Sequence, residues 1–77
     1  YLSQPFDIVV ANIVAAVHCE LALHYPVPIA LGGHLILGGI VDERADLVTA
    51  AMAELPLALA ERIDEERWVN LVYTRTP

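Results

Sequence analysis

The chain has 77 residues, a formal net charge of −6 and 57% hydrophobic residues, which fits one small domain or part of a larger one. Only four residues are Lys or Arg, and this argues against a nucleic-acid surface, because phosphate binding requires clustered basic side chains. No apolar run approaches the roughly 20 residues of a membrane span. The hydrophobic fraction exceeds the roughly 45–50% of ordinary soluble domains, so we expect a partner subunit or the rest of the same domain to cover part of the surface. The single Cys19 cannot form an internal disulfide, which fits a reducing cytoplasm.

The first expected element is a strand at Ile8-Val9-Val10-Ala11, an apolar run typical of parallel strands that are covered on both faces. An amphipathic helix is predicted over residues 13–25, because one apolar stripe recurs at helical spacing: Val14, Val17, Leu21 and Tyr25. Pro26 and Pro28 end or kink this helix, since neither has a backbone donor.

In the second part of the chain, Gly32-Gly33 predicts a turn into another apolar strand over residues 34–40. Asp42 is the expected N-cap of a second helix, which Pro56 ends and whose inward face is Ala45, Val48, Met52 and Leu55. The segments "LALAERIDE" and "WVNLVYTRT" then form a hairpin around "EER". The order β-α-β-α-β-β predicts an α/β fold in which the first strands pair in parallel and the last strand is antiparallel.

Ligands of such sheets bind beyond the carboxyl ends of the parallel strands. Here these ends are Ala11-Asn12 and Gly38-Gly39-Ile40. Asn12 has two interpretations: it caps the helix that follows, or it is a polar group that works at the strand end. Gly38-Gly39 likewise either lets a substrate or cofactor approach the backbone or makes a tight turn into the next helix.

Other polar and aromatic residues favour structural roles. His18 and His24 lie six residues apart, which does not align metal ligands on one helical face, so we expect both on the helix surface. His34 is expected at the start of the second strand. Asp42 and Glu43 fit helix capping better than an acid–base pair, and Trp68 fits the core.

Three motifs in order, "VVANI", "LGGI" and "ERWVNLVY", resemble the C-terminal half of the bacterial ribosomal-protein methyltransferase family. The resemblance covers roughly Phe6 to Tyr73. The family methylates protein eleven of the large ribosomal subunit with S-adenosylmethionine. Its catalytic domain is a Rossmann-like class I methyltransferase, of which residues 1–77 would be a part that supplies strands four to seven.

The resemblance also implies site roles and what lies outside the chain. Asn12 would position the acceptor amine, with the backbone of Ala11 and Ile13 beside it, and the strand end Gly38, Gly39 and Ile40 would line the pocket. The glycine-rich loop and the ribose-binding acidic residue that hold the cofactor in this family are not among these residues. Local departures from the family pattern are Gly38 in place of Ser or Thr, Leu31 in place of Pro, and Pro26 and Pro28 within the helix.

Three hypotheses therefore stand. The chain is half of a catalytic domain that acts on amines of a ribosomal protein, and the missing N-terminal half adjoins its first strand. Alternatively, it is a non-catalytic α/β fragment that dimerises or interacts with another chain through that exposed edge. The third hypothesis keeps the enzyme class but makes the acceptor a small molecule or a nucleic acid, and the acidic charge disfavours the latter.

Overall fold

The computed structural model describes residues 5–77 and contains four strands and two α-helices in the expected order. Two single turns of 3₁₀-helix, η1 and η2, adjoin the α-helices. The elements are β1 (Phe6–Asn12), α1 (Ala15–Leu21), η1 (Ala22–His24), β2 (Ile29–Val41), η2 (Asp42–Arg44), α2 (Ala45–Met52), β3 (Leu57–Glu65) and β4 (Trp68–Arg75).

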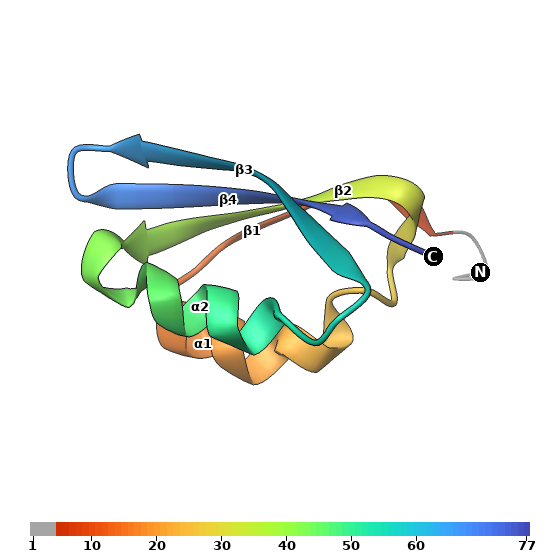
Figure 1. The fold of residues 1–77 in the computed structure, drawn as a ribbon, viewed down its shortest axis with the longest axis horizontal. Coiled ribbons are helices and arrows are strands. Elements are labelled where there is room, and N and C mark those ends of the chain that lie inside the picture. Colours follow the sequence, from red (N-terminus) through yellow and green to blue (C-terminus); the bar gives the residue numbers. More distant parts are fainter. Residues whose placement is uncertain (1–4) are drawn as a thin grey trace.

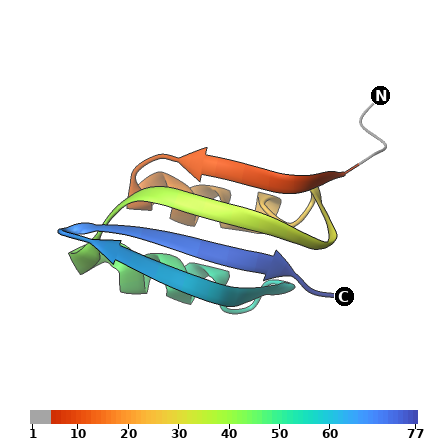
Figure 2. The same cartoon turned by 90° about the horizontal axis from the view of Figure 1, so that it is seen from above.

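The four strands form one sheet in the order β1-β2-β4-β3, as Figure 2 shows. β1 and β2 are parallel, whereas β4 is antiparallel to both of its neighbours, β2 and β3. The predicted α/β class and the antiparallel last strand are therefore confirmed. Because β1 and β2 are parallel, their carboxyl ends meet at one edge of the sheet.

Both α-helices lie against the same face of the sheet (Figure 1). Residues 5–77 by themselves cover only one face of β1, since the side chains of Ile8 and Val10 on the other face are 59% and 65% exposed. We call the side of the sheet away from α1 and α2 the open face. Successive residues of a strand point to opposite faces, so this face presents Ile8, Val10 and Asn12 of β1, Gly38 of β2, and Asn70 and Val72 of β4.

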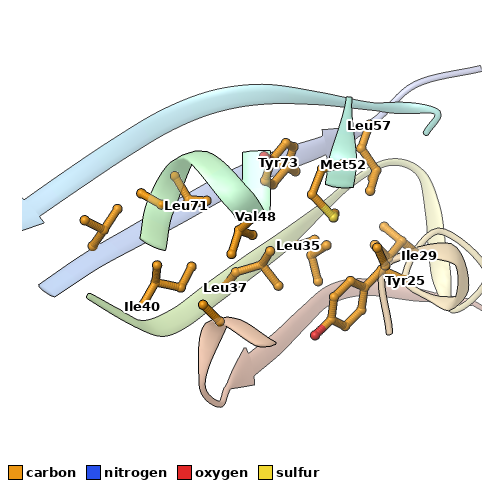
Figure 3. Close-up of a cluster of buried hydrophobic side chains, with 14 residues drawn as sticks. Tyr25, Ile29, Leu35, Leu37, Ile40, Val48, Met52, Leu57, Leu71 and Tyr73 are labelled. Atoms are coloured by element: carbon orange, nitrogen blue, oxygen red, sulfur yellow. The ribbon is translucent and has the colours of Figure 1, made fainter. Parts of the chain in front are cut away.

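The hydrophobic core fills the space between the helices and the other face of the sheet (Figure 3). β2 and β4 contribute its central side chains, which are Leu35, Leu37, Ile40, Val69, Leu71 and Tyr73. The inward face predicted for α2 is confirmed, because Ala45, Val48 and Met52 are fully or almost fully buried. Leu55 is partly buried against the core but lies beyond the end of α2.

The buried stripe of α1 differs from the predicted one. Val14 and Leu21 are exposed, and the buried residues of this segment are Ala15, His18, Ala22 and Tyr25. These four also recur at helical spacing, so periodicity alone did not distinguish the two stripes. The α-helix is also shorter than residues 13–25, because it passes into η1 at Ala22 and the 3₁₀ turn ends before Pro26.

Gly32 and Gly33 lie inside β2 and do not form a turn before it, so that prediction was wrong. The pairing of β1 with β2 shifts register between Phe6–Ile29 and Ile8–His34, and Gly32 has a φ of 79°. A Cβ atom at Gly33 would lie 2.8 Å from the backbone oxygens of Asp7 and Ala30. The glycines therefore allow β2 to bulge where it passes β1.

The hairpin of β3 and β4 is confirmed, although β4 ends at Arg75, one residue earlier than predicted. Its turn contains Glu66 at a φ of 57°. No helix in residues 5–77 is long and apolar enough to cross a membrane.

The core predicts which substitutions destabilise the fold. Replacing fully buried Leu71 with Ala leaves a cavity between the sheet and α2, and we expect a loss of about 2–5 kcal/mol in the free energy of unfolding. The control Leu47→Ala, at a half-exposed position of α2, should cost less than about 1 kcal/mol. Urea denaturation of the two variants tests this, and equal losses would contradict the assigned core.

Candidate functional site

The carboxyl ends of β1 and β2 lie side by side, and Asn12 pairs with Gly38. Gly39 has a φ of 77°, which L side chains rarely adopt. A Cβ atom at Gly39 would lie 2.6 Å from the backbone oxygen of Ile13 and 3.0 Å from Asn12 Oδ1. Glycine is therefore required here because the end of β1 itself approaches β2, and not because of a turn into the next helix.

Asn12 does not cap α1. The N-cap of that helix is Val14, and no side chain bonds to its first turn. The Asn12 side chain is exposed on the open face, and it takes part in none of the side-chain hydrogen bonds of residues 5–77. The capping interpretation was thus wrong, and the amide is free to bind a ligand.

A pocket of about 430 Å³ adjoins Asn12. It is lined by Asn12, Gly39, Glu65, Trp68 and Asn70. Gly39 and Trp68 also line a second pocket of about 310 Å³, together with Val14, Ala15, Ala16, Val41 and Arg44. Trp68 is 49% exposed and lines both pockets. The prediction that it belongs to the core was therefore wrong.

Of the other predicted site residues, Gly38 lies opposite Asn12 on β2, whereas the side chains of Ala11 and Ile40 turn away from the pocket. The Ala11 side chain packs against the core, so this residue can contribute only its backbone. Ile40 is fully buried under the helices and lines neither pocket, which corrects its expected position. The reason is the shift in β2–β4 register between Leu37 and Ile40, which reverses the alternation of side chains after Gly38-Gly39.

Sequence reasoning missed Glu65 and Asn70 as pocket residues. Asn70 lies between Val69 and Leu71, both fully buried, so alternation along β4 would have placed its amide on the opposite face. Glu65 ends β3 and pairs with Trp68 across the hairpin. The one ion pair within residues 5–77 joins Arg62 to Asp64, so Glu65 has no ionic partner there. The hydrogen bond from the Arg62 guanidinium lowers the pKa of the Asp64 carboxyl.

His18 supports the site from the helix side. It is fully buried, which corrects its expected exposure. Its Nε2 lies 2.7 Å from the backbone oxygen of Gly38, and its Nδ1 lies 2.8 Å from the Tyr25 hydroxyl. A carbonyl only accepts, so Nε2 donates to Gly38 and Nδ1 accepts from Tyr25. Burial raises the pKa of Tyr25, so its hydroxyl keeps its proton to a higher pH than an exposed tyrosine does.

The remaining polar candidates lie elsewhere. His24 is exposed, as expected, and His34 lies within β2 and not at its start, with Nδ1 3.3 Å from Thr74 Oγ1. Asp42 makes no side-chain cap, although its backbone N–H donates to the Arg67 oxygen at 2.8 Å. In residues 5–77 no three His, Cys, Asp or Glu side chains come close enough to hold a metal ion.

Comparison with known proteins identifies the family. A family model described as ribosomal protein L11 methyltransferase (PrmA) matches residues 1–76. The chain belongs to the ribosomal protein L11 methyltransferase family. The methyltransferase of Thermus thermophilus is 42% identical over 71 residues, which are 92% of this chain and 28% of that protein. The methyltransferase of Pelotomaculum thermopropionicum is 46% identical over 65 residues, which are 84% of this chain and 21% of that protein.

The fold agrees with this family. The crystal structure of the ribosomal protein L11 methylase of Lactobacillus delbrueckii subsp. bulgaricus matches with a TM-score of 0.88 at 25% identity. The match covers 97% of this chain and 39% of that protein. The resemblance seen in the three motifs is therefore confirmed, and the chain spans well under half the length of these relatives.

The hydrogen bonds of His18 predict that Tyr25→Phe destabilises the protein by about 1–3 kcal/mol, because Nδ1 would be left buried without its donor. Tyr73→Phe is the matched control. Tyr73 is also buried, and its hydroxyl makes no hydrogen bond within residues 5–77, so we expect a change of no more than about 0.5 kcal/mol. Thermal or urea unfolding compares the two variants. A Tyr25→Phe variant as stable as the control would rule out the assigned bond.

Proposed function

We propose that this chain is the C-terminal half of the catalytic domain of an S-adenosylmethionine-dependent methyltransferase, which methylates amino groups of ribosomal protein L11 in the cytoplasm. The observation that carries the proposal is the free amide of Asn12 at the carboxyl end of β1, beside the Gly38-Gly39 bulge, in a chain of this family. The main cofactor-binding motif is proposed to precede residue 1.

The acceptor amine must be neutral and correctly oriented. Free lysine has a pKa of about 10.4, so the amine has to release a proton to water before it reacts. When S-adenosylmethionine is bound, it supplies a methyl group: the new nitrogen–carbon bond forms as the carbon–sulfur bond breaks, the bonding electron pair goes to sulfur, and the methylated nitrogen afterwards loses a proton to water.

Asn12 orients the acceptor and does not act as a base. Its side-chain oxygen accepts a hydrogen bond from an N–H group of the amine, and this directs the nitrogen lone pair away from the amide. Orientation of this kind contributes up to about 7–11 kcal/mol in favourable intramolecular reactions. The position supports the role, because ligands of parallel sheets bind beyond the carboxyl ends of the strands.

We propose that the described residues contact only the reacting end of the cofactor. Asn12 and Gly39 form one side of the 430 Å³ pocket and offer amide and backbone groups. The carboxylate of Glu65 lines the same pocket and lacks an ion-pair partner within residues 5–77, so it attracts a lysine side chain as it arrives in its charged form.

The edge of β1 and the open face also support a larger catalytic domain. Phe6, Ile8 and Val10 are more than half exposed on an edge strand, which is an unusual position for three large apolar side chains. We propose that the N-terminal half of the same domain covers them. The same exposure favours the second candidate, a non-catalytic chain that dimerises through β1.

Cofactor binding separates the two candidates. The 77-residue chain alone should not bind S-adenosylmethionine at micromolar concentration in a calorimetric titration, whereas the protein extended by the N-terminal half should. Micromolar binding by the chain alone would place the cofactor site inside residues 1–77. No binding by the extended protein would favour the dimerising module.

Asn12→Ala tests the catalytic role in the extended enzyme. Turnover with ribosomal protein L11 should fall roughly 10²-fold, because the acceptor is no longer held in position, and this loss should be much larger than any loss of affinity for S-adenosylmethionine. Glu54→Ala is the control, since Glu54 is exposed beyond the end of α2 and lies outside the pocket. Turnover equal to that of the control would remove Asn12 from the mechanism.

A further inference from the structure

A second amide lies beside Asn12, on the other side of β2. Asn70 belongs to β4, which flanks β2 opposite to β1. A Cβ atom at Gly38 would lie 2.8 Å from Asn70 Oδ1 and 3.0 Å from Asn12 Oδ1. The two amide oxygens therefore approach the same point above the bare Cα of Gly38, each from a different neighbouring strand.

Both amides are available to a ligand. They line the same pocket, and neither takes part in a side-chain hydrogen bond in the described part of the chain. Asn70 is only half-buried, so its amide reaches the pocket without being sealed in the core. A side chain at Gly38 would occupy the space between the two oxygens. Glycine leaves this space empty, so both amide oxygens can lie close to the same point.

We propose that Asn70 contacts the acceptor amine directly, as the second of two amide oxygens that bind its N–H groups. This inference rests on the proposed function. A neutral primary amine has two N–H donors and one lone pair. Two acceptors placed side by side hold both donors, so that the lone pair points away from both amides.

Each methyl transfer removes one N–H group from the acceptor amine, so the two transfers should depend on Asn70 to different extents. A primary amine uses both Asn12 and Asn70. A monomethylated amine has one N–H left, which a single amide oxygen can hold. Loss of Asn70 should therefore slow the first methyl transfer more than the second, whereas a general loss of structure would slow both transfers equally.

The test uses the extended enzyme, purified ribosomal protein L11 and mass spectrometry of the products over time. We expect Asn70→Leu to slow the first transfer about tenfold, which corresponds to the loss of one hydrogen bond, and the second transfer less than threefold. Thr74→Val is the matched control, because Thr74 is a half-buried polar residue of the same strand outside the pocket. It should retain the wild-type rates of both transfers.

Gly38→Ala provides an independent variant. The backbone of Gly38 lies outside the left-handed region, and the added methyl group would meet the ends of two side chains. The variant should therefore fold but push both amides apart. Because Asn12 is displaced as well as Asn70, we expect this variant to slow both transfers and to bind L11 with reduced affinity in a calorimetric titration.

The outcomes separate this inference from the function on which it rests. If the wild-type enzyme does not methylate L11, the proposed function fails. If the wild-type enzyme is active and Asn70→Leu slows both transfers equally or neither, Asn70 is not an acceptor contact. Selective slowing of the first transfer by Asn70→Leu, with slowing of both transfers by Gly38→Ala, would establish the paired amides, and wild-type rates in Gly38→Ala would contradict them.

Discussion

The close approach of the β1 and β2 carboxyl ends is the contact on which the site depends. Asn12 pairs with Gly38, and the backbone oxygen of Ile13 comes so near Gly39 that a Cβ atom would have no room. This contact requires glycine at a positive φ, and it forms the bulge that turns Ile40 into the core. One local constraint thus sets both the position of the amide and the packing beneath it.

The helix side of the sheet holds this arrangement in place. His18 donates to the Gly38 oxygen from below, and Tyr25 completes its hydrogen bonding, so the strand end is fixed from the core while its other face stays open. Gly38 therefore connects the two sides of the sheet, because it pairs with Asn12 and its backbone oxygen accepts a hydrogen bond from His18. Burial of the polar His18 is tolerated because both of its ring nitrogens are satisfied.

The sequence predicted the order of elements, the hairpin and the inward face of α2, because that helix has a single apolar stripe. It did not predict the stripe of α1, since nearly every side of that segment is apolar and the buried set includes a histidine. Ile40 was misplaced because a bulge reverses side-chain alternation, and no local pattern distinguishes a Gly-Gly bulge from a Gly-Gly turn. Asn70 was missed because its importance comes from strand neighbours that are far apart in sequence.

A crystal structure of the extended enzyme with S-adenosylhomocysteine and a lysine-containing segment of L11 would test the role of Asn12 most directly. We expect the acceptor nitrogen to lie within about 2.7–3.2 Å of Asn12 Oδ1, above Gly38 on the open face. An acceptor nitrogen bound away from the ends of β1 and β2, with the Asn12 amide turned to solvent, would contradict it.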